Sequence, residues 1–319
     1  MKLLIASPRG FCAGVERAIH TVEKTLELYR PPVYVKHEIV HNKHVISYLE
    51  EKGARFIEDL SLVPEGSVII YSAHGVSPQV RQEAKDRRLT EIDATCGLVT
   101  KVHSAAKRWA KRGYKIILIG HKDHVEVIGT AGEAPEATHI VENPSDVDRL
   151  TFSPSDPLFY LTQTTLSVLD VEQIVQKLVE KYPQIETLPS SSICYATTNR
   201  QVALRQFAKT TDLFLVVGDS TSSNSNRLCE IAKSEGPNAY LINDEQEIDP
   251  DWLQSCQVIG MSAGASTPET VVQKCIERLQ ELGVTSIEEV LHKKEEVVFD
   301  LPKNLRSALE KKAASSEAS

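Results

Sequence analysis

The chain repeats one pattern of helices and strands three times, and this repeat limits the folds that it can adopt. Each repeat begins at a cysteine in a small, polar context and continues into an amphipathic helix and then a strand. A cluster of polar side chains follows that strand, 28 or 29 residues after the cysteine in every repeat. The cysteines that open the repeats are Cys12, Cys96 and Cys194.

A second strand in each repeat also ends in small polar residues. The segments SAHGVSP and SAGASTP at two of these ends are similar in sequence. A further helix closes each repeat. The polar side chains that follow the strands are His41 and His74 in the first repeat, His124, Glu126 and Thr164 in the second, and Ser222, Ser223, Asn224 and Ser266 in the third.

This alternation predicts an α/β fold of three similar small domains, each with a parallel sheet flanked by helices. Functional groups in open α/β sheets gather beyond the carboxyl ends of the strands, where the polar clusters fall. We therefore expect a pseudo-threefold trefoil around a shared centre. The expected domains cover residues 14–96, 97–193 and 194–281, residues 1–13 join the centre, and residues 282–319 form a return segment. The polar end, EKKAASSEAS, is expected to fray.

The alternative organisation is three independent domains in line, which leaves three similarly placed thiols without a common purpose.

Composition and hydropathy exclude some classes of protein. The net charge of −8 argues against a nonspecific nucleic-acid binder, which needs a basic surface. No apolar run approaches the length of a membrane span, and the N-terminal apolar stretch is too short for a signal peptide. We expect a cytoplasmic protein.

The six cysteines fall into two groups. Cys229, Cys256 and Cys275 lie in apolar runs and are expected to be buried packing residues. The cysteines that open the repeats lie before helices, where backbone N–H groups and the helix dipole favour a thiolate. One such cysteine could simply be a small residue in a tight place. Three thiolates can hold zinc with one open position, or an iron–sulfur cluster with one iron that lacks protein sulfur.

The polar clusters suggest the chemistry of a ligand. Histidine, serine and asparagine donors suit a phosphate or diphosphate, whose charge would favour imidazolium forms. Glu126 is the exception, since an adjacent diphosphate would raise its pKa and let it deliver a proton, with Thr164 passing that proton or orienting a water. Each feature also has a structural explanation: a solvated loop histidine, HVEV as an exposed strand, or a helix capped by Ser225 or Asn226. The Gly-rich frames of nucleotide sites are absent from the sequence.

These residues together resemble a known family. The chain is similar to the 4-hydroxy-3-methylbut-2-enyl diphosphate reductases, which are LytB-type iron–sulfur enzymes, from about residue 3 to about residue 287. The motifs that carry the resemblance are PRGFCAGVERA, HEIVHNKHV, SAHGVSP, DATCGLVTKVH, GHKDHVEVIGTAGE, TQTTLS, CYATTNRQ, SSNSNRL and SAGAS.

The resemblance implies a role for each candidate residue. Cys12, Cys96 and Cys194 would ligate one [4Fe–4S] cluster, which aerobic handling could degrade to [3Fe–4S] or remove. Thr164 and Glu126 would lie near the substrate's allylic hydroxyl and, together with His124, would be the catalytic residues. The residues that would hold the diphosphate are His41, His74, His124, Ser222, Ser223, Asn224 and Ser266.

The implied reaction is reductive dehydroxylation of (E)-4-hydroxy-3-methylbut-2-enyl diphosphate to isopentenyl and dimethylallyl diphosphate, the last step of the methylerythritol phosphate route to isoprenoids. The cluster would have an open fourth iron, and a ferredoxin or flavodoxin would deliver the electrons. Two other hypotheses stay open. One is a three-lobed iron–sulfur dehydratase similar to quinolinate synthase, and the other is a redox sensor without chemistry of its own.

Overall fold

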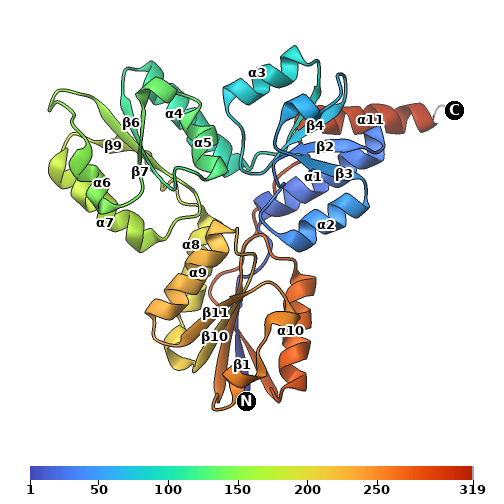
Figure 1. Ribbon diagram of the computed structural model, residues 1–319, viewed down its shortest axis with the longest axis vertical. Helices are drawn as coiled ribbons and strands as arrows, with labels where there is room; N and C mark the ends of the chain where they lie inside the picture. Colours follow the sequence, from blue (N-terminus) through green and yellow to red (C-terminus); the bar gives the residue numbers. More distant parts are fainter. Residues whose placement is uncertain (318–319) are drawn as a thin grey trace.

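Three lobes surround a common centre in the computed structural model, which describes residues 1–317 (Figure 1). Each lobe contains one sheet, and every paired strand in the three sheets is parallel. This confirms the predicted fold class of three similar parallel-sheet α/β units. Within residues 1–317, none of the helices combines the length and apolar character needed to cross a lipid bilayer.

The first lobe has the strand order β3-β2-β4-β5. Its strands are β2 (Val33–Lys36), β3 (Ala54–Ile57), β4 (Val68–Tyr71) and β5 (Thr90–Asp93), and its helices are α1 (Ala13–Tyr29), α2 (Lys43–Glu51) and α3 (Pro78–Asp86).

The second lobe repeats this order as β7-β6-β8-β9. Its strands are β6 (Lys115–Ile119), β7 (Thr138–Val141), β8 (Leu158–Thr162) and β9 (Glu186–Thr187), and its helices are α4 (Gly97–Lys111), α5 (Val125–Ala131), α6 (Pro144–Arg149) and α7 (Val168–Lys181).

The third lobe combines both ends of the chain, in the order β11-β10-β12-β1-β13. Its strands are β1 (Lys2–Ser7), β10 (Leu213–Val217), β11 (Asn238–Ile242), β12 (Val258–Ala263) and β13 (Ser286–Leu291), and its helices are α8 (Tyr195–Arg205), α9 (Ser223–Ser234) and α10 (Glu269–Glu281). Short 3-10 helices lie at Leu60–Leu62, Pro135–Ala137, Ala208–Thr210, Glu245–Glu247 and Pro250–Leu253.

The strand before each opening cysteine occupies an equivalent place. Strand β5 precedes Cys96 and pairs with β4, β9 precedes Cys194 and pairs with β8, and β1 precedes Cys12 and pairs with β12. Each of these strands therefore belongs to the sheet of one lobe, whereas the helix that follows its cysteine belongs to the next lobe around the centre. The domain limits expected from the sequence stay predictions, and β1 lies in the stretch expected to join the centre.

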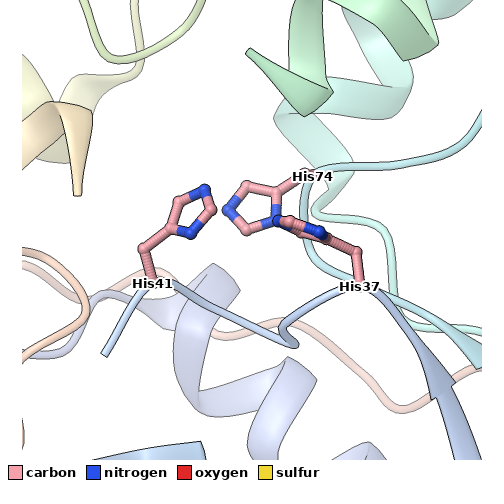
Figure 2. Close-up of side chains that lie close together, drawn as sticks. All are labelled: His37, His41 and His74. Carbon is pink, nitrogen blue, oxygen red and sulfur yellow. The ribbon is translucent and has the colours of Figure 1, made fainter. Parts of the chain in front are cut away.

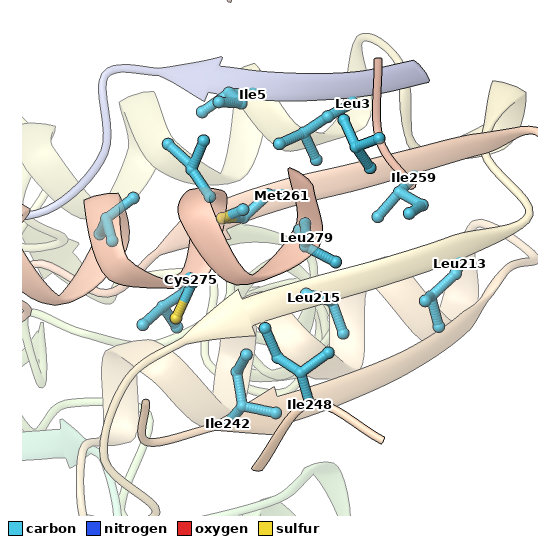
Figure 3. Close-up of a cluster of buried hydrophobic side chains, with 14 of the residues drawn as sticks. Leu3, Ile5, Leu213, Leu215, Ile242, Ile248, Ile259, Met261, Cys275 and Leu279 are labelled. Carbon is cyan, nitrogen blue, oxygen red and sulfur yellow. The ribbon is translucent and has the colours of Figure 1, made fainter. Parts of the chain in front are cut away.

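Apolar strands supply the core of each lobe. All five residues of β10 are buried, because helices cover both faces of a parallel sheet. Figure 3 shows Cys275 and Leu279 of α10 among the side chains of the third lobe's sheet. Cys229 and Cys256 are also buried, which confirms that these three cysteines are packing residues.

The C-terminal segment leaves the third lobe after β13 and ends as α11 (Lys303–Glu317), beside α1 of the first lobe (Figure 1). The expected fraying from residue 310 is wrong for the described residues, since α11 continues to Glu317. Leu305 is fully buried in the first lobe's core and Leu309 packs against it, which anchors a helix of strong helix formers. Residues 318 and 319 lie outside the described residues.

Candidate functional site

One central cavity receives side chains from all three lobes. Three domains in line would not share a cavity, so that alternative is wrong. Every site residue expected from the sequence lines it. These residues are Cys12, Cys96 and Cys194, the histidines His41, His74 and His124, the pair Glu126 and Thr164, and the polar group Ser222, Ser223, Asn224 and Ser266.

Cys12, Cys96 and Cys194 are the N-cap residues of α1, α4 and α8, and none of them uses its side chain to cap its helix. Their backbone N–H groups are bound in an equivalent way. Each donates to a carbonyl oxygen in the loop that follows a strand. The Cys12 N–H donates to Ala265 after β12 (3.2 Å), the Cys96 N–H to Ala73 after β4 (3.0 Å), and the Cys194 N–H to Thr164 after β8 (2.9 Å). The positive ends of three helices therefore face the centre beside three thiols.

Gly14 shows how closely two of the sulfur atoms approach. A Cβ at this position would lie 2.6 Å from Cys96 Sγ and 3.9 Å from Cys12 Sγ, so only glycine leaves them room. Burial raises the pKa of Cys96 to about 11 and that of Cys194 to about 12, and the neighbouring Cys12 adds to both shifts. Three thiols that oppose each other's ionisation need a cationic centre to become thiolates. This donor set fits a metal ion or an iron–sulfur cluster.

Four histidine rings form a second group in the site. The ring centroid of His74 lies 4.3 Å from that of His41 and 6.0 Å from that of His124. The sequence analysis missed His37, whose ring lies 5.4 Å from His41 and 5.9 Å from His74. The spacing in HEIVH could have indicated it, because His37 and His41 stand at the two ends of one short loop after β2.

The environment of His74 and His124 favours the neutral forms of their rings. Burial holds the pKa of His74 well below its ordinary value and lowers that of His124 to about 3, and the neighbouring histidines add to both shifts. Without an anion the rings of His74 and His124 are therefore mostly uncharged at neutral pH. The imidazolium forms expected from the sequence require the charge of a bound diphosphate.

Glu126 is buried at the start of α5, and among residues 1–317 its carboxylate is hydrogen-bonded only by Thr164. Its Oε1 accepts the Thr164 N–H at 2.7 Å, and its Oε2 accepts the Thr164 hydroxyl at 2.9 Å. Burial raises the pKa of Glu126, whereas these two bonds lower it, and the balance is upward. Burial therefore raises the pKa of Glu126 even without the neighbouring diphosphate to which the sequence analysis attributed this shift. His124 caps α5, so the exposed-strand explanation of HVEV is wrong.

The third lobe contributes hydroxyl and amide groups. Ser222, rather than Ser225 or Asn226, caps α9, with Ser225 N–H donating to its Oγ at 3.3 Å. Asn224 Oδ1 accepts the Ala265 N–H at 2.8 Å, and its buried Nδ2 finds no hydrogen-bond partner among residues 1–317. Such a donor beside a helix N-terminus is suited to an anion.

Two further contacts join the lobes around these groups. Ser266 Oγ donates to the backbone oxygen of His41 at 2.9 Å, and Thr165 Oγ1 donates to Ser223 Oγ at 3.0 Å. Thr165 also lines the cavity and was not predicted, although it lies within the TQTTLS motif. These bonds position the polar groups of the third lobe against the other two.

Comparisons with known proteins place the chain in a family. The family model described as "LytB protein" matches residues 3–280. A protein of Protochlamydia amoebophila named 4-hydroxy-3-methylbut-2-enyl diphosphate reductase is 65% identical over 97% of this chain and 98% of its own. The solved structure of the E-1-hydroxy-2-methyl-but-2-enyl-4-diphosphate reductase from Plasmodium falciparum is 50% identical, covers 98% of this chain and 99% of its own, and has a TM-score of 0.96.

A second solved structure is described as (E)-4-hydroxy-3-methyl-but-2-enyl diphosphate reductase, the terminal enzyme of the non-mevalonate pathway. It is 31% identical, covers 88% of this chain and 99% of its own, and has a TM-score of 0.64. The match of the family model over most of the chain, together with these identities, shows that the chain belongs to the LytB family.

Proposed function

We propose that this chain reduces (E)-4-hydroxy-3-methylbut-2-enyl diphosphate to isopentenyl diphosphate and dimethylallyl diphosphate. The observation that carries the proposal is that three thiols, a protonatable carboxyl group and a set of anion-binding groups line one cavity. The names of the relatives support the same substrate. A redox sensor would need no such set of diphosphate donors.

Cys12, Cys96 and Cys194 would hold a [4Fe–4S] cluster at the centre. When bound, such a cluster with one iron free of protein sulfur supplies electrons singly and a Lewis-acidic iron. The cysteines reach it from three helix N-termini, whose dipoles stabilise the thiolate charge. A carrier of single electrons, a ferredoxin or a flavodoxin, would reduce the enzyme.

The diphosphate would lie between the lobes, on the α9 N-terminus and the histidines. Asn224 Nδ2 is a buried donor without a partner, and a phosphate oxygen would satisfy it. The other proposed ligands are His41, His74, His124, Ser222, Ser223 and Ser266, with Thr164 near the reacting carbon. The negative charge of the ligand would raise the pKa values of His74 and His124 and favour their imidazolium forms, which donate from both ring nitrogens.

Glu126 would hold one of the two protons that the reaction consumes together with two electrons. When Glu126 is protonated, its Oε2–H can donate to Thr164 Oγ1, and the threonine hydroxyl is then free to donate toward the cavity. A proton therefore has a two-step route from the carboxyl group to the substrate. His124, whose Nδ1 accepts the Glu126 N–H at 3.1 Å, fixes the start of the helix that carries this group.

The test is turnover by Glu126→Gln, which keeps the size of the side chain and an acceptor for the Thr164 N–H. We expect kcat to fall by at least a factor of about 100, as loss of a general acid predicts. Iron content and substrate affinity should stay close to those of the unchanged protein.

Glu136→Gln, an exposed position in the same lobe, is the matched control and should turn over normally. Normal turnover by Glu126→Gln would show that the proton comes from elsewhere. If the anaerobic, cluster-loaded protein with a low-potential reductant left the substrate unconsumed, the proposed function itself would be wrong.

A further inference from the structure

We propose that His37, His41 and His74 form a binding site for one divalent transition-metal ion of the Zn²⁺ class. One ring nitrogen from each residue lies within 4.8 Å of the other two (Figure 2). Three imidazoles with an open fourth position are a common zinc ligand set. Zinc–nitrogen bonds of about 2.0 Å place the ligand atoms roughly 3.4 Å apart, so the distances between the ring nitrogens need to shorten by up to about 1.4 Å.

Hydrogen bonds on the outer side of each ring favour this role. Every ring is bound at Nδ1, which leaves Nε2 for a metal. The pairs are His37 with Glu58 Oε1 (2.7 Å), His41 with Glu38 Oε2 (2.9 Å) and His74 with Ser72 Oγ (3.3 Å). An ionised carboxylate can only accept, so Nδ1 of His37 and His41 carries the hydrogen and Nε2 carries a lone pair. Carboxylate–histidine pairs of this kind orient metal-binding histidines.

His37 adds an independent observation. Its Nε2 is shielded from solvent and finds no hydrogen-bond partner among residues 1–317. An acceptor buried without a partner is unfavourable, and a metal ion would satisfy it. His37 does not line the central cavity, so its arrangement is not explained by contact with a substrate there.

The metal ion and the substrate would exclude one another, an inference that rests on the proposed function. His41 and His74 line the cavity and are the proposed donors to the diphosphate. An imidazole whose Nε2 binds a metal has no Nε2–H to donate. Zn²⁺ would therefore raise the KM for the diphosphate substrate and leave kcat unchanged.

The first experiment measures Zn²⁺ binding to the anaerobic, cluster-loaded protein by equilibrium dialysis and metal analysis. We expect one additional Zn²⁺ per chain, and an affinity at least about tenfold weaker in His37→Asn. Asparagine is chosen because His37 has a φ of 61°, which asparagine tolerates. The matched control is His20→Ala, an exposed histidine of the same lobe, which should bind as the unchanged protein does.

Zinc K-edge X-ray absorption then identifies the ligand atoms. Imidazole nitrogen at about 2.0 Å supports the site, whereas sulfur at about 2.3 Å places the ion on cysteines and overturns the proposal. The proposal also fails if no Zn²⁺ binds, or if His37→Asn binds it as tightly as His20→Ala does.

Steady-state kinetics test the competition separately. An increase in KM with Zn²⁺ that His37→Asn abolishes supports mutual exclusion, and an unchanged KM refutes it. The binding and absorption experiments need no turnover, so their outcome is independent of whether the proposed reaction is correct.

Discussion

Replacing Glu295 by glutamine will destabilise the protein, because it removes the charge that opposes a fully buried arginine. Arg200 of α8 is 0% exposed, and its Nη1 lies 3.2 Å from both carboxylate oxygens of Glu295 in the segment after β13. The guanidinium also donates to the backbone oxygens of Gly10, Phe11 and Ala196. One side chain thus joins the Cys12 loop, α8 and the C-terminal segment.

The expected loss in the free energy of unfolding is about 2–3 kcal/mol. Removing one partner of a buried ion pair costs about 3–5 kcal/mol. Glutamine retains one carbonyl oxygen that can accept from Arg200, and the three backbone oxygens still bind the guanidinium, so we expect a loss slightly below this range. Glu295 is only 15% exposed, so water cannot readily replace its charge. A protein of this size should then lose roughly 3–5 °C in Tm.

Thermal unfolding of the cluster-loaded protein, followed by circular dichroism, measures this loss. The control is Glu296→Gln, at a side chain that is 78% exposed and lies 3.8 Å from the equally exposed Lys294. Its Tm should change by no more than about 1 °C, because exposed ion pairs contribute little. If Glu295→Gln were as stable as Glu296→Gln, the reasoning about Arg200 would be wrong.

Three further predictions follow from single contacts. Gly14→Ala places a Cβ 2.6 Å from Cys96 Sγ, so iron bound per chain after anaerobic reconstitution should fall by more than half. Burial alone would raise the pKa of Asp93, but Arg81 and other donors outweigh it and lower this pKa. The stability that Asp93 contributes is thus present above about pH 4 and is lost as the pH falls further. The difference in the free energy of unfolding between Asp93→Asn and the unchanged protein, measured by urea unfolding, should therefore shrink from pH 7 to pH 3. Deleting residues 303–319 exposes the first-lobe core around Leu305, and Tm should fall by several degrees in differential scanning calorimetry.

Local sequence patterns were sufficient to predict the repeated α/β units. Buried parallel strands read as continuous apolar runs, as LFLVV in β10 does, and the polar residues that end them mark the edge of each sheet. The equal spacing from cysteine to polar cluster was enough to place these groups on one centre. The resemblance to a family then supplied expectations that spacing alone does not give, such as the choice of a [4Fe–4S] cluster rather than zinc for the three cysteines.

Long-range contacts account for what the sequence did not reveal. α11 has a polar sequence, and its stability comes from burying Leu305 against a lobe that begins almost 300 residues earlier. Arg200 lies in a helix that would be expected to expose it, and it is buried because Glu295 and three carbonyl oxygens surround it. His37 stands four residues before His41, outside the polar cluster that the search by repeat equivalence used, so that search passed over it.

The ring of lobes also explains why the N-terminal strand belongs to the C-terminal lobe. Each opening cysteine is positioned by the strand before it, which lies in the sheet of the preceding unit, and for Cys12 the preceding unit is the last one. Strand β1 therefore pairs with β12, and the Cys12 N–H reaches Ala265, although more than 250 residues separate them in sequence. The backbone contacts of Cys96 and Cys194 are made to the first and second lobes, whereas the contact of Cys12 is made to the third lobe. Because contacts of such long sequence separation form late and slowly, the complete set of three thiols should arise only when the whole chain has folded.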